Sequence, residues 1–214
     1  MSEARAYHHG NLREALLEAG LQLTRAGGPS ALVLRDVTRR VGVSPNAAYR
    51  HFADRAGLLQ AVVERVQQEM TALMHPDGTP DGEDPAARAR AQLRAVGLGY
   101  IDFALREPGW FELAFAAPEL GRAPGPGPGS GYDHAPGPPL PAPLARLVDA
   151  LDGLVAAGVL RPEERPGAEW PCWSAVHGFA LLALHGPLRG LPAEELRRSA
   201  ERTVDAVVRG VTGG

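Results

Sequence analysis

A short run of polar, basic and aromatic side chains at residues 46–51 has the composition of a nucleic-acid contact. Asn46 and Ala47 come first, and Tyr49, Arg50 and His51 follow. Tyr, Arg and His all carry donors that reach phosphate oxygens, and an Asn amide matches the hydrogen-bonding edge of adenine. Ala47 has no donor or acceptor, so we expect at most a contact with a thymine methyl group. The chemistry that this run indicates is binding to double-stranded DNA.

Residues 34–59 predict two short helices that would position this run. Gly42 permits the left-handed residue that ends the first helix, and Ser44 can cap the second, with Pro45 in its first turn. The apolar anchors of the pair are Val37, Val41 and Val43. This order is typical of a helix-turn-helix whose second helix enters the major groove.

A plain helical corner is the alternative reading of residues 34–59. In that case Tyr49 and Phe52 pack inside and the arginines are solvated. The preceding segment, residues 9–26, favours the first reading because it predicts a bracing helix, so that three helices form one small domain. The apolar stripe of that helix consists of Leu12, Ala15, Leu16, Ala19, Leu23 and Ala26.

The first 60 or so residues resemble the DNA-binding domain of the TetR family of bacterial transcriptional regulators. The resemblance rests on NLREALLEAGLQLTRAGG, on RDVTRRVGVSPNAAYRHF and on the following DRAGLL. It implies that Tyr49 and His51 contact phosphates and that Asn46 and Ala47 face bases. It also implies that Arg55 clamps the DNA backbone from the start of a fourth helix, at a position where the family usually has a basic residue.

Arg39 or Arg40 would have to supply any reading of guanine, although a solvated helix face explains both equally well. Residues 7–9, Tyr-His-His, form either an arm against the DNA or a frayed terminus. The full set expected at the DNA is Arg35, Thr38, Arg39, Ser44, Asn46, Ala47, Tyr49, Arg50, His51 and Arg55.

Charge and composition set the limits of this interpretation. Residues 1–74 hold nine arginines against seven acids, whereas residues 75–214 hold thirteen against eighteen, and the chain has no lysine. Only residues 1–74 have an excess of positive charge, which suits binding to a polyanion, and that excess is modest. We therefore expect the affinity for DNA to depend on where the basic side chains lie and on dimerisation. The single cysteine, the lack of a signal-peptide pattern and the lack of a long apolar run predict a cytoplasmic protein without membrane segments.

The fold class expected for the 214 residues is all-α. We expect a helix-turn-helix domain over residues 1–54 and a larger effector-binding and dimerisation domain over residues 55–214. Helical periodicity predicts helices at 55–74, 86–106, 144–157, 167–188 and 193–211, with an aromatic segment at 109–120 opened by Pro108. A Gly/Pro-rich loop is predicted at 118–143.

The last two helices resemble the pair through which TetR-family proteins form a four-helix dimer interface. A two-fold dimer would present two recognition helices to half-sites of a palindromic operator about 34 to 36 Å apart. The alternative, that both helices only close the monomer core, stays open because apolar periodicity does not separate core from interface.

An aromatic cluster in the second part of the chain predicts a small-molecule pocket. Its members are Tyr100, Phe103, Trp110, Phe111, Phe115, Trp170, Trp173 and Phe179, with His177 and His185 as polar groups. We expect ligand contacts from Tyr100, Phe103, Trp110, Phe111, Phe115, Trp173 and His177, although each aromatic taken singly also suits core packing. The segment partly resembles a TetR subgroup with a Trp-His-Gly signature, since Trp173 here precedes His177 and Gly178 by three intervening residues.

Catalysis finds little support in the sequence. The best enzymatic reading is a thiol hydrolase that uses Cys172 and His177, but five residues along one helix turn them off a common face. No metal spacing, phosphate-binding loop or cofactor motif appears, so we expect no cofactor and no metal. The sequence therefore predicts a ligand-responsive DNA-binding regulator, a repressor released from its operator by a small molecule, with an effector-independent DNA-binding regulator as the alternative.

Overall fold

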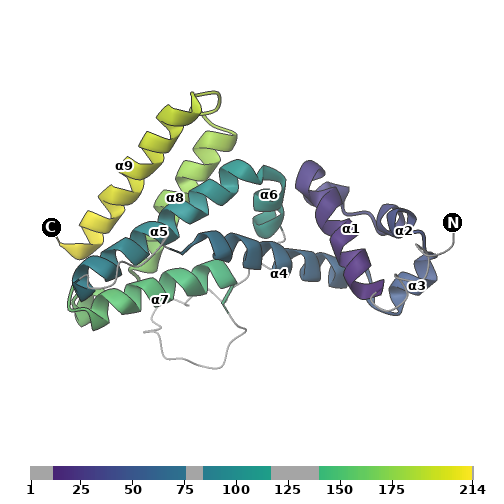
Figure 1. Cartoon of the computed structure of the whole chain (residues 1–214), viewed down its shortest axis with the longest axis horizontal. Helices are drawn as coiled ribbons and strands as arrows, with labels where there is room; N and C mark the ends of the chain where they lie inside the picture. Colours follow the sequence, from purple (N-terminus) through teal and green to yellow (C-terminus); the bar gives the residue numbers. More distant parts are fainter. Residues whose placement is uncertain (1–11, 76–83, 117–139, 214) are drawn as a thin grey trace. The chain divides into compact units, whose positions relative to one another are not determined.

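Figure 1 shows the computed structural model of the chain, which describes residues 12–75, 84–116 and 140–213. Within these ranges every regular element is a helix, so the all-α prediction is confirmed. The α-helices are α1 (Leu12–Gly27), α2 (Leu34–Val41), α3 (Pro45–Tyr49), α4 (Arg55–Leu73), α5 (Pro85–Arg106), α6 (Pro108–Ala116), α7 (Ala142–Ala156), α8 (Glu169–Leu184) and α9 (Ala193–Thr212). Two short 3₁₀ helices, η1 (Pro29–Ala31) and η2 (Pro162–Glu164), precede α2 and α8.

Two compact units make up the chain. The first contains α1, α2, α3, α4 as far as Val66, and α6. The second contains α4 from Gln67 onward, α5, α7, α8 and α9. The boundary predicted between residues 54 and 55 therefore differs from the division of the structure, because α4 as far as Val66 and the whole of α6 belong with the N-terminal helices.

The first unit closes around α1. Helices α2, α3 and α6 all contact it, and Gly20 lets Val62 of α4 approach, since a Cβ on Gly20 would lie 2.9 Å from a Val62 methyl group. Of the predicted stripe of α1, Leu16 and Ala19 are buried, whereas Ala26 at the C-terminal end of the helix is exposed. Leu17 and Leu21 are buried as well, so the apolar face of α1 is wider than the predicted stripe.

Helix α6 joins this unit through a backbone contact with the C-terminal end of α1. A Cβ on Gly109 would lie 2.4 Å from the carbonyl oxygen of Arg25, so only glycine fits there. Next to it, the indole N–H of Trp110 donates to the carbonyl oxygen of Leu21 at 2.9 Å. Arg25 lies over the Trp110 ring and forms an ion pair with Glu107.

The second unit is built on α5, which contacts α7, α8 and α9, and α8 packs along α9 (Figure 1). The core of this unit includes Val96 and Phe103 of α5 and Met70 of α4, all of which are buried. Gly99 lets α5 cross the end of α4, because a Cβ there would lie 2.1 Å from the carbonyl oxygen of Leu73.

Most of the predicted Gly/Pro-rich loop 118–143 lies outside the described residues, as do residues 7–9 of the expected arm. The predicted end of that loop, residue 143, is too late in the sequence, since α7 already begins at Ala142. Pro141 occupies the N-cap position, and Pro143 fits the first turn because no N–H is needed there. Among the described helices, none is both long enough and apolar enough to cross a bilayer.

Candidate functional site

The turn between α2 and α3 forms as its residue types require. Gly42 has φ 79° and ψ 31°, and its N–H bonds the carbonyl oxygens of Thr38 and Arg39, which ends α2. Ser44 stands extended at the N-cap of α3, with Pro45 in the first turn. The side chain of Ser44 makes no cap hydrogen bond, so the predicted capping role is not seen. Two short helices are thus joined by a sharp turn.

Of the two large aromatic side chains in and just after α3, one is exposed and the other is buried. Tyr49 is 52% exposed, whereas Phe52 is 5% exposed and lies beneath the guanidinium of Arg13 at 5.1 Å from the ring centroid. The helical-corner alternative, which placed both aromatics inside, is therefore wrong for Tyr49. Ala48 is the residue of α3 that is fully buried. An exposed Tyr beside exposed Arg50 and His51 gives three adjacent donors on one surface.

Most of the other residues expected at the DNA are also exposed in the structure. They are Arg35, Arg39, Ser44, Asn46 and Arg55, and Ala47 is half-buried. Thr38 is an exception: it is 2% exposed, and its hydroxyl donates to the carbonyl oxygen of Arg35 at 3.0 Å. Its inclusion was wrong, because a Thr on the inner face of a helix bonds its own backbone one turn earlier.

Arg55 has a structural role that the sequence did not reveal. Its Nε donates to the carbonyl oxygen of Leu32 at 2.7 Å and its Nη2 to that of Pro29 at 3.3 Å. The guanidinium thus holds the segment that leads into α2. Arg39 pairs with Asp36 at 2.8 Å, an exposed pair that contributes little stability and that DNA phosphates can displace.

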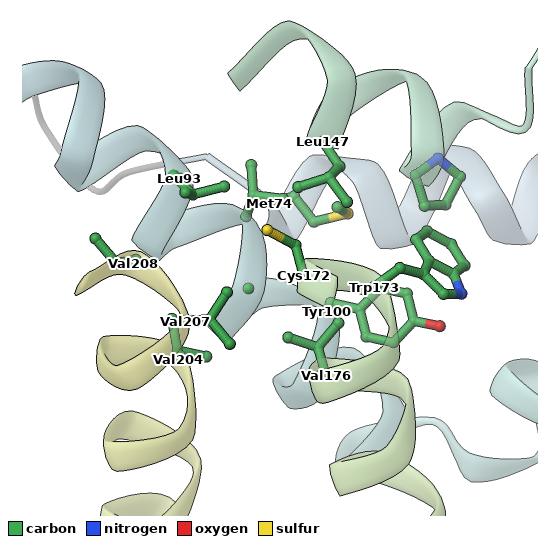
Figure 2. Close-up of a pocket in the computed structure, with 13 residues that line it drawn as sticks. Met74, Leu93, Tyr100, Leu147, Cys172, Trp173, Val176, Val204, Val207 and Val208 are labelled. Carbon is green, nitrogen blue, oxygen red and sulfur yellow. The ribbon is translucent and has the colours of Figure 1, made fainter. Parts of the chain in front are cut away.

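A second candidate site lies within the second unit, where α5, α7, α8 and α9 surround a pocket (Figure 2). Its free space is about 370 Å³ when the open mouth is counted. The lining is formed by Met74, Leu93, Val96, Gly97, Tyr100, Pro143, Leu147, Cys172, Trp173, Val176, Val204, Val207 and Val208. It is almost wholly apolar, which is typical of sites for small organic molecules.

One hydrogen bond orders the aromatic wall of this pocket. The Tyr100 hydroxyl lies 2.9 Å from Nδ1 of His177, and the Tyr100 ring meets the Trp173 ring edge to face at 5.1 Å. Burial raises the pKa of Tyr100 and lowers the pKa of His177, so both side chains are held in their neutral forms.

The predicted ligand residues are divided between the two units. Tyr100 and Trp173 line the pocket, and His177 contacts Tyr100. Phe103 is buried on α5 outside the lining. Trp110, Phe111 and Phe115 lie on α6 in the first unit and are not part of this lining, so their contact with a ligand stays a prediction. The prediction missed the aliphatic part of the lining, such as Val204, Val207 and Val208, because it rested on aromatic residues and His177.

Chemistry at Cys172 gains no support from this geometry. The thiol is 3% exposed, and burial, with the nearby Glu169 carboxylate, raises its pKa to about 11. A nucleophilic thiolate needs the opposite shift. The His177 ring faces Tyr100 through Nδ1. Among the described residues, no group of three or more His, Cys, Asp or Glu side chains is arranged to hold a metal ion.

Both parts of the chain match one family. Residues 16–62 match the family described as bacterial regulatory proteins, tetR family, and residues 93–207, more than half of the chain, match the tetracyclin repressor-like C-terminal domain. The chain belongs to the TetR family. Its membership accounts for both the helix-turn-helix unit and the helical unit with its pocket. The partial Trp-His-Gly signature stays a prediction.

Relatives of this TetR-family chain are known in several bacteria. The HTH-type transcriptional repressor Rv3405c of Mycobacterium tuberculosis is 31% identical over 88 residues, which are 40% of this chain and 47% of that protein. The match thus spans about half the length of the relative. A protein of unknown function from Rhodococcus sp. RHA1 is 28% identical, with a TM-score of 0.66, over 97% of this chain and 99% of the other.

A TetR variant from Acinetobacter baumannii, solved in complex with minocycline, shares the fold of this TetR-family chain. It has a TM-score of 0.59 at 17% identity and covers 91% of this chain and 93% of its own. That likeness extends over both units and supports the all-α architecture.

Proposed function

We propose that this TetR-family protein is a homodimeric DNA-binding repressor that a small molecule releases from its operator. The observation that carries the proposal is the surface at the C-terminal end of α3, where Tyr49 and the next two residues, Arg50 and His51, are exposed while Ala48 is buried. A helix that merely packs within a domain has no need to leave a large Tyr half in solvent beside two further donors. Asn46 stands exposed near the N-terminus of the same helix, where recognition helices contact base edges.

The roles within this surface divide by chemistry. Tyr49, Arg50 and His51 donate to phosphates, which fixes the position of α3 without reading the sequence. Asn46 is the residue of α3 that is equipped to read a base, with adenine as the best match. Arg55 positions the start of α2 through Leu32 and acts on DNA binding through that contact as well as through its charge.

The proposal that the chain dimerises through α8 and α9 is supported by the apolar side chains that α8 leaves exposed. Its inner residues, such as Val176 and Ala180, are buried, yet Trp170, Leu181 and Leu182 are exposed on the same helix. A Cβ on Gly178 would meet no atom within 4 Å, so a second helix has room to approach closely there. Apolar side chains around a small residue suit a self-complementary two-fold contact.

The pocket of the second unit is the proposed effector site. It is bounded by α8 and α9, which are also the proposed dimer helices, and by Met74, the residue that follows α4. A ligand that changes the packing of these helices would favour dimers in which the distance between the two helix-turn-helix units does not fit the operator. The function needs no catalytic step, so we assign none, and we place the protein with DNA in the cytoplasm.

Selection of bound duplexes from a random pool tests the DNA-binding part of the proposal. The expected product is a palindrome with half-sites about one helical turn apart, as a two-fold dimer requires. An unenriched pool would refute DNA recognition, and enrichment of a single half-site would refute the dimeric mode. An effector-independent regulator would give the same palindrome, but no compound that binds the pocket would change its affinity.

A further inference from the structure

The pocket of the second unit has no ionised group in its wall. Of its lining residues, those with a heteroatom in the side chain are Met74, Tyr100, Cys172 and Trp173, apart from the ring nitrogen of Pro143. All are uncharged near neutral pH, since burial raises the pKa of Cys172 to about 11 and raises that of Tyr100 above its ordinary value. The wall therefore offers no charge to pair with an ionic ligand.

The polar atoms of the aromatic wall are directed away from the aliphatic part of the pocket. Figure 2 shows the Tyr100 oxygen pointing away from Leu93 and Val208, and the hydroxyl bonds His177 instead. Ring edges and methyl groups thus face the space between α5, α8 and α9. A ligand in this space meets carbon and sulfur.

Two ion pairs lie next to lining residues. Arg94 follows Leu93 on α5 and pairs at 2.7 Å with Asp205, which follows Val204 on α9. Arg165 pairs with the buried Glu169 at 2.9 Å, three residues before Cys172 on α8. Arg146, which precedes Leu147 on α7, bonds the His75 ring and is not part of the lining. An ionised ligand would therefore find no opposite charge in the lining itself, and to bury its charge there without compensation is strongly unfavourable.

Taking the pocket to be the effector site proposed above, we infer that the effector is a compact, uncharged, hydrocarbon-rich molecule. Its size follows from the free space of about 370 Å³. This figure counts the open mouth, so the enclosed space is smaller and suits only a small molecule. Burial of apolar surface drives binding, and shape sets selectivity.

Matched pairs of neutral and charged probes test this inference on the full chain. Naphthalene and n-butylbenzene are the neutral probes, and 2-naphthoate and 4-butylbenzoate are their carboxylates. Calorimetry and thermal unfolding should show that each neutral probe binds and raises the Tm, with each carboxylate at least about tenfold weaker. A carboxylate that binds as tightly as its neutral partner, or failure of both neutral probes to bind, overturns the inference.

A pair of variants on α9 locates the site. Val207→Phe fills the pocket, whereas Val211→Phe makes the same change four residues later on α9 at a half-buried valine outside the lining. Val207→Phe should weaken naphthalene binding at least about tenfold and Val211→Phe should leave it within twofold. Gly97→Ala is a smaller second change, which adds one methyl group about 3.1 Å from the Val204 methyls. It should also weaken naphthalene binding. Equal binding by all three variants would place the probe elsewhere and refute the inference.

The outcomes separate this inference from the proposed function. If the protein selects a palindromic duplex but binds only the carboxylates, the inference fails and DNA binding stands. If the neutral probes bind at Val207 but no duplex is selected, the ligand class stands and the proposed regulatory function fails.

Discussion

The hydroxyl of Tyr100 on α5 lies 2.9 Å from Nδ1 of His177 on α8, and it joins two helices of the pocket wall. Tyr100 is only 1% exposed. A neutral His177 with an unprotonated Nδ1 accepts the hydrogen bond from the hydroxyl, whereas a protonated ring has no lone pair at that nitrogen. The contact therefore links the charge of His177 to the packing of α5 against α8.

Acidification should destabilise the protein through His177. Burial lowers the pKa of His177 in the folded state, so between that value and the unfolded value near 6.5 the unfolded chain binds more protons. This contribution to stability is fully present above pH 6.5 and is lost as the pH falls through 6.5 toward the folded pKa. Thermal unfolding of the wild type between pH 7.5 and 5.5 should show the loss.

The matched variant for this test is His177→Asn, whose amide oxygen can accept the same Tyr100 hydrogen bond without titrating. Its Tm should fall less than that of the wild type over the same pH range, because all other histidines are unchanged. Identical slopes in the two proteins would show that His177 does not sense pH.

Tyr49 and Asn46 should affect DNA binding in different ways. Tyr49→Phe removes one phosphate hydrogen bond and should weaken binding about fivefold, or about 1 kcal/mol, on every duplex alike. Asn46→Ala should cost about 1 to 3 kcal/mol at one base position and relax the preference there. Affinities for a panel of single-base operator variants check both. The assignment is reversed if Tyr49→Phe alters the preferred sequence and Asn46→Ala does not. Arg55 is unsuited to this test, because its loss also releases Leu32.

Gly109 should tolerate no side chain, whereas Gly153 should tolerate one. A Cβ at Gly109 would lie 2.4 Å from the Arg25 carbonyl oxygen, and that of Gly153 in α7 would meet no atom within 4 Å. Gly109→Ala should lower the free energy of unfolding by about 2 kcal/mol or more, since overpacking against backbone relaxes poorly. Gly153→Ala should raise it by up to about 1 kcal/mol, as alanine is the better helix former. Denaturant unfolding measures both, and a stable Gly109→Ala protein would refute the contact between α6 and α1.

Leu181 should be needed for dimerisation. Leu181→Glu places a charge on the exposed apolar face of α8 and should weaken self-association by about thirtyfold, or about 2 kcal/mol. Val33→Glu is the control, because Val33 is similarly exposed but lies in the first unit. Sedimentation analysis over a range of protein concentrations checks the pair. Equal dimerisation of both variants would rule out α8 as the interface.

Local signals predicted the helix-turn-helix well, because each step is encoded by adjacent residues. Gly42 supplies a left-handed backbone and Pro45 starts α3, and both do so whatever lies elsewhere in the chain. Thr38 was misplaced because a helix with a buried Thr and one with an exposed Thr share the same local pattern. Burial of Thr38 depends on what packs above it.

The position of α6 could not be read from the sequence. The apolar pattern of residues 109–115 predicts burial but not the partner, and the carbonyl of Leu21 that accepts from Trp110 lies 89 residues away. The lining of the pocket was predicted only in part for the same reason. Val204 and Leu93 meet only because α5 and α9 pack together, and aliphatic side chains carry no local mark of a ligand site.

The affinity of the dimer for its selected duplex, measured with and without pocket ligands, tests the central claim most directly. The neutral probes that bind at Val207 provide the ligands, and the Val207→Phe variant is the control. We predict that at least one such ligand lowers the affinity for the duplex about tenfold or more in the wild type and leaves it unchanged in Val207→Phe. If every ligand that occupies the pocket leaves the affinity unchanged, the protein is not a ligand-responsive repressor.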